Sequence, residues 1–355
     1  MNSSNDTMNA LVLHGVGDAR LERIPTPKPG PGEVLVRIGS CGVCGSDIPR
    51  IFEKGTYKFP TVCGHEFAGT IAAVGPGVAR YSVDDRVAVY PLVWCGECPP
   101  CEQGRYAQCY DYDYLGSRSD GAFAEYVVAP ERNLVRVPEG VTLEEAAMTE
   151  PAAVALHALK RAGGCKPGET VAIYGAGPIG ILVAQWARSM GAERVILFDL
   201  VEEKLRLARS LDFEFSLQAY KMDCVGIVYD LTNGEGVDIS VEAAGRPKPL
   251  LQALQSANRG GRVVLLGNPS DEVTISAELI SQAMRKEVQI LGTWNSEFSG
   301  SGDDDDWREV LKAVANKKID LKSLITHRVG LKNALEALFM MRDGKEFYSK
   351  VLVRP

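Results

Sequence analysis

A glycine-rich turn between a strand and a helix constrains this fold more than any other feature of the sequence. The turn Gly175–Gly180 reads G-A-G-P-I-G, follows the apolar run Thr170–Tyr174 and opens the helix-like stretch Ile179–Met190. Asp199 lies nineteen residues after the last glycine, at the end of the next apolar run. On its own, G-x-G-x-x-G can be a helix-packing turn, but in this context it is typical of a dinucleotide-binding βαβ unit.

Each glycine of this turn has a physical role. Gly175 permits the tight turn, Gly177 lets the backbone approach a pyrophosphate, and Gly180 allows close packing of helix on strand. The helix start offers free N–H groups to the phosphates. Asp199 is expected to accept hydrogen bonds from the adenosine ribose, with Lys204 beside it. Because a carboxylate there repels a 2′-phosphate, the sequence predicts NAD rather than NADP.

The remaining pattern predicts an α/β fold with two domains. In the second half, strand-like runs alternate with helix-like stretches, which is typical of a doubly wound parallel (Rossmann) sheet. The first 150 residues instead carry short β-favouring runs between Gly and Pro, which predicts a small barrel. We expect a catalytic domain at 1–154, completed by 294–355 and its last strand, and a cofactor domain at 155–293. The predicted strands are 34–38, 67–74, 86–89, 123–128, 170–174, 194–198, 237–241, 262–266, 288–291 and 350–353, and the later helices are 202–211, 249–257, 277–285, 307–315 and 331–341.

Charge and hydropathy exclude several classes of function. The 355 residues include 39 Lys and Arg against 46 Asp and Glu, a net charge of −7. An acidic chain without a basic tract is a poor partner for nucleic acid or an anionic membrane. No stretch approaches the roughly 18 apolar residues of a membrane span, and the polar N-terminus has no secretion signal. We therefore expect a cytoplasmic protein.

Four of the nine cysteines fall within fifteen residues. Cys95, Cys98, Cys101 and Cys109 have the spacing C-x2-C-x2-C-x7-C. In a cytoplasmic chain this clustering favours a metal over disulfides. The bacterial iron–sulfur spacing is different, so zinc is the preferred metal. Four thiolates leave no open position, which predicts a structural zinc site.

A second set of ligand types is more dispersed. Cys44 lies in Gly42–Asp47 (GVCGSD) and His65 in Gly64–Glu66 (GHE). Adjacent Glu66 and the distant Glu150 could complete the set, which would hold a second zinc ion with a position left for substrate. From spacing alone, the alternative that this Cys and His are core residues stays open.

These motifs together resemble the zinc-dependent medium-chain dehydrogenase family of the alcohol and sorbitol dehydrogenase type. The GVCGSD and GHE segments, the four-cysteine loop and the glycine turn occur in family order and span almost the whole chain. The resemblance implies a GroES-like β-barrel catalytic domain plus a Rossmann domain. Within the family, the chain looks most like polyol dehydrogenases of the galactitol-1-phosphate kind. Further matching segments are Asp120–Tyr126 (DGAFAEY), Glu150–Pro151, Cys44–Phe52, Leu115–Arg118 (LGSR) and Gly292–Trp294 (GTW).

The resemblance also implies roles for particular residues. Cys44, His65 and Glu150 match catalytic zinc ligands, and Glu66 matches a carboxylate that enters or leaves the coordination sphere. Ser46 matches the hydroxyl that hydrogen-bonds the reacting alcohol. The matching cofactor positions are Gly175, Gly177, Pro178, Ile179, Gly180, Asp199, Lys204, Leu266, Gly267, Asn268, Thr293, Trp294, Asn295 and Lys350, the last as a basic residue that reaches the pyrophosphate.

Two positions depart from the family pattern. Many relatives carry a proton-relay histidine where this chain has Pro49, so that relay is absent. Arg50 follows, where sorbitol dehydrogenases place a tyrosine that faces the substrate. An arginine can bind a phosphate or several hydroxyls bidentately, and Arg50 could equally form a surface ion pair.

The sequence thus predicts an enzyme with two zinc ions per chain and NAD, acting on a small molecule as a homodimer or homotetramer. The expected reaction oxidises a secondary alcohol of a polyol or polyol phosphate, such as galactitol 1-phosphate or sorbitol, to a ketose or ketose phosphate. The alternatives are a dehydrogenase of another alcohol, such as threonine or a simple diol, or a catalytically silent NAD-binding homologue.

Overall fold

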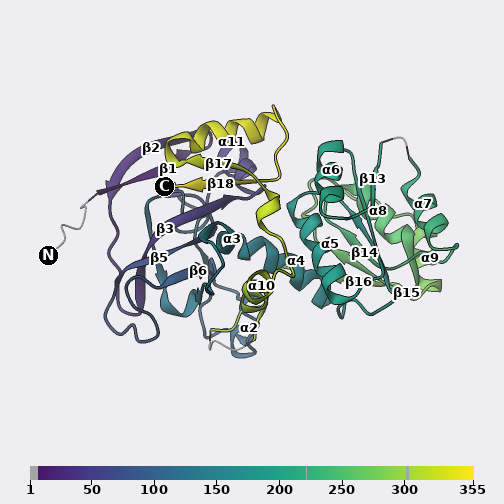
Figure 1. The fold of residues 1–355 in the computed structure, drawn as a ribbon, viewed down its shortest axis with the longest axis horizontal. Coiled ribbons are helices and arrows are strands. Elements are labelled where there is room, and N and C mark those ends of the chain that lie inside the picture. Colours follow the sequence, from purple (N-terminus) through teal and green to yellow (C-terminus); the bar gives the residue numbers. More distant parts are fainter. Residues whose placement is uncertain (1–6, 221, 301–303) are drawn as a thin grey trace. The chain divides into compact units, whose positions relative to one another are not determined.

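The chain folds into two compact units in a computed structural model that describes residues 7–220, 222–300 and 304–355. Unit 1 comprises Met1–Glu150 and Glu297–Pro355, and unit 2 comprises Pro151–Ser296. Figure 1 follows the chain out of unit 1 and back into it. The expected borders, after residue 154 and before residue 294, lie near these limits.

Unit 1 is rich in short strands, as the β-favouring runs predict, and these pair antiparallel except for β17 with β18. Its largest sheet has the order β10-β6-β5-β3-β18-β17, and β9 also pairs with β3. The last strand, β18, returns from the chain's end to pair with β3, with Val351 opposite Val43. The strands are β1 (Thr7–Gly15), β2 (Asp18–Pro25), β3 (Glu33–Val43), β4 (Thr61–Val62), β5 (Glu66–Val74), β6 (Arg86–Val89), β7 (Leu92–Val93), β8 (Asp113–Tyr114), β9 (Tyr126–Pro130), β10 (Leu134–Arg136), β17 (Ile325–Gly330) and β18 (Lys350–Arg354).

The helices of unit 1 are short and lie between these strands or after unit 2. Two of them carry residues predicted for the active site: η1, a π-helical turn that begins with Arg50, and α4, which starts in unit 1 and contains Glu150. They are α1 (Asp47–Pro49), η1 (Arg50–Lys54), α2 (Pro99–Glu102), η2 (Tyr106–Gln108), η3 (Glu131–Asn133), α3 (Leu143–Ala147), α4 (Thr149–Arg161), α10 (Asp306–Ala315), η4 (Lys322–Leu324), η5 (Leu331–Asn333) and α11 (Ala334–Asp343).

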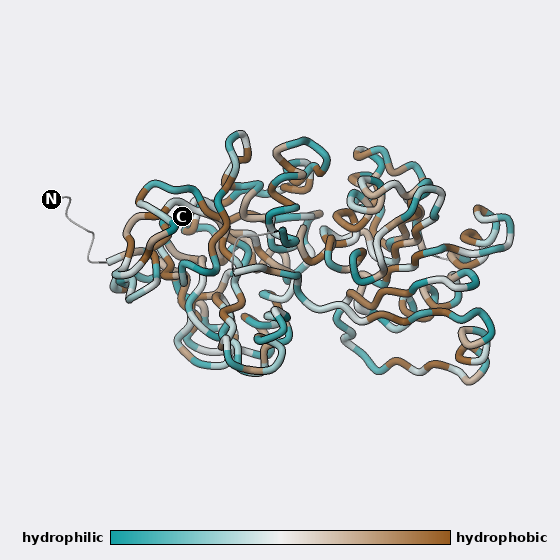
Figure 2. Tube along the Cα trace, turned by 90° about the horizontal axis from the view of Figure 1, so that it is seen from below, coloured by the Kyte–Doolittle hydropathy of each residue, from teal (hydrophilic) through white to brown (hydrophobic). Residues whose placement is uncertain are grey.

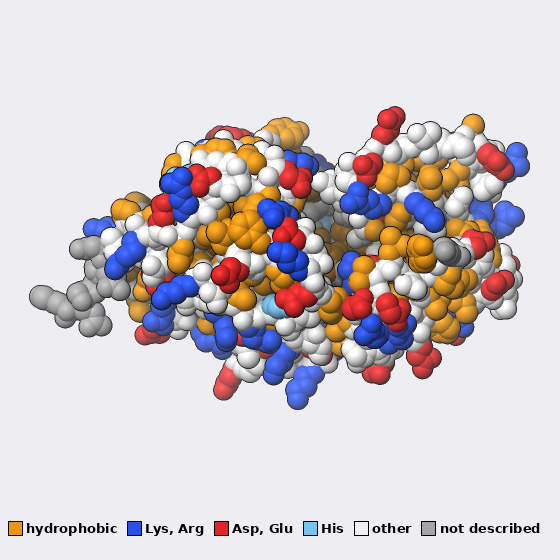
Figure 3. All heavy atoms as spheres, turned by 90° about the horizontal axis from the view of Figure 1, so that it is seen from above, with side chains coloured by type: hydrophobic (Ala, Val, Ile, Leu, Met, Phe, Trp, Pro, Cys, Tyr) orange, Lys and Arg blue, Asp and Glu red, His pale blue; other side chains and the backbone are white. Residues whose placement is uncertain are grey.

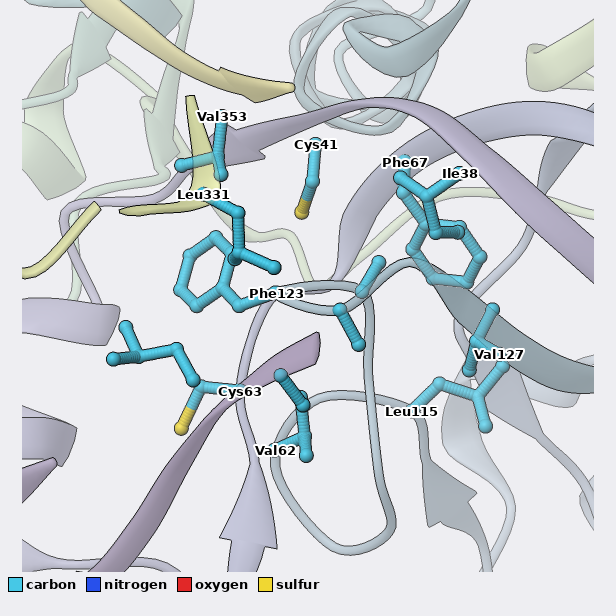
Figure 4. Packing of buried hydrophobic residues seen from close by; sticks show 14 of the residues in the cluster. Ile38, Cys41, Val62, Cys63, Phe67, Leu115, Phe123, Val127, Leu331 and Val353 are labelled. Atoms are coloured by element: carbon cyan, nitrogen blue, oxygen red, sulfur yellow. The ribbon is translucent and has the colours of Figure 1, made fainter. Parts of the chain in front are cut away.

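The core of unit 1 forms where the strands of its sheets face each other. Phe123 lies completely buried among side chains from distant parts of the chain, including Leu331 and Val353 (Figure 4). Cys41 and Cys63 belong to the same cluster, so these two cysteines act as small apolar core residues. The core therefore ties the C-terminal segment to the first barrel strands.

Unit 2 is the predicted Rossmann sheet. Its six strands are all parallel, in the order β13-β12-β11-β14-β15-β16. This is the doubly wound order 3-2-1-4-5-6, in which the strand order reverses next to the first strand. The sequence patterns missed β13 and α7. The elements are β11 (Thr170–Tyr174), α5 (Pro178–Met190), β12 (Arg194–Asp199), α6 (Glu202–Ser210), β13 (Phe215–Gln218), α7 (Cys224–Leu231), β14 (Val237–Glu242), α8 (Pro247–Ser256), β15 (Ala257–Leu265), α9 (Ala277–Arg285) and β16 (Gln289–Gly292).

Hydropathy and charge are distributed as in an ordinary globular protein. Hydrophobic segments run through the interior of each unit, and many outer loops are hydrophilic (Figure 2). On the face shown in Figure 3, cationic and anionic side chains are interspersed, without a broad area of one sign. Within the described ranges, every helix is too short or too polar to cross a bilayer.

Candidate active site and cofactor pocket

The predicted zinc site of Cys44, His65 and Glu66 is assembled from two neighbouring strands of unit 1. Cys44 follows directly after β3, and His65 directly precedes β5, which begins with Glu66. β3 and β5 are antiparallel neighbours with Gly42 opposite Glu66, so their pairing brings the two ligand segments together. One ligand atom from each of Cys44, His65 and Glu66 lies within 4.8 Å of the others. A thiolate, an imidazole and a carboxylate form a donor set that fits Zn²⁺.

Asp47 orients the cysteine loop and the histidine. Its buried carboxylate accepts a hydrogen bond from the Cys44 N–H at 3.0 Å and one from Arg50 Nη1 at 2.7 Å. His65 Nδ1 lies 3.5 Å from Asp47 Oδ1 and makes no hydrogen bond of its own. Burial opposes ionisation, but the charges of His65 and Arg50 outweigh it and hold the pKa of Asp47 below its usual range. His65 Nδ1, buried and without a hydrogen bond, also fits a site that a metal ion completes.

Arg50, predicted as a substrate contact, is occupied by this carboxylate. Its side chain is only 21% exposed, and its positive charge is balanced by Asp47. The geometry therefore gives Arg50 a part in holding the cysteine loop. Binding of a substrate phosphate by Arg50 stays a prediction.

Lys350 lies deep in unit 1, where it forms an ion pair with Glu66. Its Nζ donates to Glu66 Oε1 at 2.8 Å and Oε2 at 2.6 Å, and also to the Val43 carbonyl at 3.3 Å. The two side chains are 4% and 1% exposed. Both oxygens of Glu66 are thus engaged by an ammonium in this structure. The expected contact of Lys350 with a pyrophosphate remains a prediction that these bonds do not support.

Glu150 and Ser46 occupy different environments at this site. Glu150 lies in the first turn of α4, buried, where its Oε1 accepts a hydrogen bond from the Tyr114 hydroxyl at 3.3 Å. Burial, with the nearby charge of Glu66, raises the pKa of Glu150 to about 7. Glu150 is not part of the compact Cys44–His65–Glu66 group. Ser46 is exposed at the start of α1 and does not cap that helix, so its hydroxyl is available to a ligand.

The four clustered cysteines converge as the sequence predicts. All four thiols are free, and their sulfur atoms lie within 4.8 Å of one another. The Sγ–Sγ distances are 3.4 Å for Cys98–Cys101 and for Cys95–Cys109, and 3.8 Å for Cys98–Cys109. A tetrahedral site with Zn–S bonds of ~2.3 Å has edges of about 3.8 Å, so this arrangement fits a zinc ion.

The glycine turn of unit 2 borders a cavity of about 450 Å³. Gly175, Gly177, Asp199 and Lys204 line it, as the dinucleotide fingerprint predicts. A Cβ on Gly180 would lie 1.8 Å from the Gly175 carbonyl oxygen, so only glycine allows α5 to pack this closely. The space in front of Gly177 is open to at least 4 Å. The turn thus has the shape that a pyrophosphate at the start of a helix requires.

Asp199 is fixed by the backbone around it. Its carboxylate accepts hydrogen bonds from the Ala176 N–H at 2.8 Å and the Val201 N–H at 2.9 Å. Lys204 Nζ lies 3.5 Å from it. The cavity also contains Arg246 and Lys248 after β14, which the sequence patterns did not identify. Their position after the end of a parallel strand is the signal that could have revealed them, since ligands bind at that edge.

The other predicted cofactor residues follow the ends of neighbouring strands. Leu266–Asn268 come directly after β15, where the Leu266 and Gly267 N–H groups donate to the Glu242 carbonyl. Thr293–Asn295 come directly after β16, and Trp294 is 60% exposed. Neither segment lines the 450 Å³ cavity. Both lie on the strand-end edge, where a longer ligand would continue.

The sequence matches two known protein domains. Residues 30–139 match the alcohol dehydrogenase GroES-like domain, and residues 178–316 match the zinc-binding dehydrogenase domain. A galactitol 1-phosphate 5-dehydrogenase of Escherichia coli K12 is 36% identical over 306 residues, covering 86% of this chain and 88% of that protein. A sorbitol dehydrogenase of Bacillus subtilis 168 is 33% identical over 354 residues, covering 98% and 97%.

Solved structures agree with the sequence relatives. The crystal structure of galactitol-1-phosphate dehydrogenase from Escherichia coli has a TM-score of 0.91 at 34% identity, covering 98% of this chain and all of that one. A zinc-binding dehydrogenase from Sinorhizobium meliloti 1021 bound to NADP has a TM-score of 0.89 at 31% identity, with coverage of 98% and 99%. The predicted fold, a GroES-like barrel with a Rossmann sheet, is therefore confirmed, and the chain belongs to the zinc-dependent medium-chain alcohol dehydrogenase family.

Proposed function

We propose that this dehydrogenase uses NAD to oxidise a secondary alcohol of a polyol or polyol phosphate to a ketone. The observation that carries the proposal is the mixed donor set of half-buried Cys44 with buried His65 and Glu66, beside Glu150. Four thiolates would close a coordination sphere, whereas a mixed set can leave a position for substrate. The named activities of the galactitol 1-phosphate and sorbitol dehydrogenase relatives support the substrate class.

Several residues of unit 1 have separate roles at this site. Bound zinc would supply Lewis acidity that makes the substrate hydroxyl easier to ionise, and NAD would accept the hydride. The exposed Ser46 hydroxyl can accept a hydrogen bond from the reacting alcohol and pass its proton on. Glu150 can hold a water that serves the same purpose. Asp47 holds the cysteine loop in place through the Cys44 N–H, and its carboxylate faces the imidazole of His65.

The proposal includes two zinc ions per chain, one in the mixed set and one among the four cysteines. Their donor types and sulfur spacings support it. The preference for NAD rests on Asp199 in the adenosine end of the cavity. The Sinorhizobium neighbour bound to NADP makes this preference a point to measure. We also propose a homodimer or homotetramer, which light scattering can test.

A substrate panel tests the proposed function. Zinc-loaded enzyme is mixed with NAD and galactitol 1-phosphate, galactitol, sorbitol, threonine or 2,3-butanediol, and NADH absorbance is followed. We expect turnover with one of the hexitols or the hexitol phosphate, and none with the Cys44→Ser variant. Turnover of threonine or the diol alone would mean that the enzyme is a dehydrogenase of another alcohol and not of a polyol. Cofactor binding without turnover of any alcohol would favour a catalytically silent homologue.

A further inference from the structure

We propose that Arg118 binds the anionic end group of the substrate, a phosphate monoester. The inference rests on the proposed function and deepens it, because it assigns the phosphate to a residue that has no role so far. Arg118 belongs to the LGSR segment, Leu115–Arg118, which is part of the resemblance to polyol dehydrogenases. The geometry around its guanidinium carries the argument.

The guanidinium is held by aromatic rings and not by a carboxylate. Its Cζ lies 4.4 Å from the ring centre of Tyr57 and 4.2 Å from that of Tyr112. Within the described part of the chain, Arg118 has neither an ion pair nor a side-chain hydrogen bond. Stacking on aromatic rings leaves the N–H groups at the edge of a guanidinium free, and these groups match two oxygens of a phosphate.

Arg50 makes the contrast clear. Its Nη1 donates to buried Asp47 at 2.7 Å, so its charge is already balanced. An anion that approached Arg50 would also meet the negative charge of Asp47. Arg118 has the same charge without that counterion. Of the two arginines in unit 1 that the sequence connects with polyol dehydrogenases, Arg118 is therefore the better anion ligand.

The loop that carries Arg118 is fixed to the strand segment that carries His65. A Cβ on Gly116 would lie 2.4 Å from the Gly64 carbonyl oxygen and 3.0 Å from the His65 nitrogen, so the two backbones are in direct contact. The Arg118 N–H donates to the Tyr114 carbonyl at 2.9 Å, which closes a tight turn. The nearby Asp120 carboxylate is occupied by the Val62 N–H at 2.9 Å.

Ring contacts connect the guanidinium to the zinc site. The ring centres of Tyr112 and Tyr114 are 6.4 Å apart, and those of Tyr114 and His65 are 5.8 Å apart. Only two aromatic side chains therefore separate Arg118 from a predicted zinc ligand. In this assignment the phosphate lies at Arg118 and the reacting hydroxyl at the His65 end of this chain of rings. Tyr57 is 73% exposed, so the arginine lies beside solvent, from which a substrate can enter.

Two substrates and two variants test this assignment. We expect Arg118→Gln to lower kcat/KM for galactitol 1-phosphate by about 10- to 100-fold, mainly through KM, because a charged bidentate contact is lost. For galactitol the loss should stay below about threefold, since no phosphate is present. Arg118→Lys keeps the charge but not the planar fork, and should recover part of the phosphate effect.

Arg342 offers a matched control. It also stacks on two rings, Phe52 at 4.9 Å and Phe339 at 4.8 Å, but its Nε donates to Asp343 at 2.6 Å. Arg342→Gln should therefore affect both substrates equally and weakly. If Arg118→Gln does the same, or if it impairs galactitol as much as galactitol 1-phosphate, Arg118 only braces the tyrosines and the inference is wrong.

Calorimetric titration separates this inference from the proposed function. Wild-type enzyme that binds galactitol 1-phosphate more tightly than Arg118→Gln, without turning it over, would support the arginine and overturn the proposed reaction. If the enzyme turns over galactitol 1-phosphate but wild type and variant bind it with equal affinity, the proposed reaction is supported and the role of Arg118 is wrong. Thermal melting of each variant shows that the fold is intact.

Discussion

The carboxylates of the two sites are held in different ways. In unit 1, Glu66 is bound by the Lys350 ammonium and Asp47 by the Arg50 guanidinium. In unit 2, Asp199 accepts hydrogen bonds from backbone N–H groups, and Glu242 at the end of β14 accepts them from Ala244 and Gly245 at 2.8 and 2.7 Å. The proposed zinc site thus depends more on ion pairs between side chains, whereas the cofactor pocket depends more on backbone N–H groups.

This difference determines how each site responds to substitution. Glu66 and Lys350 are 284 residues apart, and removal of either leaves a buried charge without a partner. Glu242 and Ala244 are two residues apart, and the backbone donor remains whatever the side chain is. We therefore expect single substitutions to damage the zinc site more severely than the cofactor pocket.

The largest effect is expected for Cys44. Cys44→Ser should lower kcat by at least ~1,000-fold while the fold persists, because a neutral hydroxyl is a poor replacement for a thiolate zinc ligand.

Cys98→Ser should instead lower the melting temperature, with activity falling as a consequence, because its site is closed and structural. Metal analysis should find two zinc ions per wild-type chain and about one in each variant. A fully active wild type with one zinc or none would contradict both expectations.

A smaller but still large effect is expected for Lys350. Lys350→Met leaves the Glu66 carboxylate buried without its cation, and loss of one partner from a buried pair typically costs about 3–5 kcal/mol in free energy of unfolding. Adding Glu66→Gln should recover much of that loss, since the stranded charge is then removed. Glu242→Gln is the matched control in unit 2: the glutamine keeps one acceptor oxygen for the backbone, so its loss should be smaller. Chemical denaturation gives the free energy of unfolding of the wild type, Lys350→Met, Glu66→Gln, the double variant and Glu242→Gln.

If Lys350→Met and Glu242→Gln lower the free energy of unfolding by the same amount, the contrast between side-chain and backbone support is wrong. A full additive loss in the double variant would likewise show that Glu66 and Lys350 are not coupled.

Much of the fold could be predicted because its signals are local. The strand β11, the glycine turn and α5 follow one another in the chain, and each sequence pattern matches its element closely. β13 was missed because Phe215–Gln218 is a short edge strand with only one buried residue, so it lacks a continuous apolar run. α7 was missed because its eight residues are too few for a clear helical period.

The predicted sites also differ in how much of them the sequence reveals, because only some of their residues lie close together in the chain. The four cysteines fall within one loop, and Asp199 lies at a fixed distance from the glycines, so their proximity is visible in the sequence. The pairing of Lys350 with Glu66 arises only when β18 pairs with β3 in the folded unit. The tyrosine rings around Arg118 are also brought together by folding. Neither could be found from spacing.

The smallest effect, and the one that tests the backbone-held site, concerns Asp199. Its carboxylate should repel the 2′-phosphate of NADP, but Lys204, Arg246 and Lys248 line the same cavity and should attract it. Two like charges about 4 Å apart repel by roughly 4 kcal/mol at an effective dielectric constant of 20. We therefore expect wild-type enzyme to prefer NAD. Asp199→Asn keeps an acceptor for the Ala176 N–H and removes the charge, so the ratio of kcat/KM for NAD over NADP should fall by about tenfold or more. Asp199→Ser, which also loses the backbone contacts, should weaken NAD further. Equal kcat/KM of the wild type with both cofactors would show that the attraction of the three cations offsets the repulsion by Asp199, and that this pocket accommodates the 2′-phosphate of NADP.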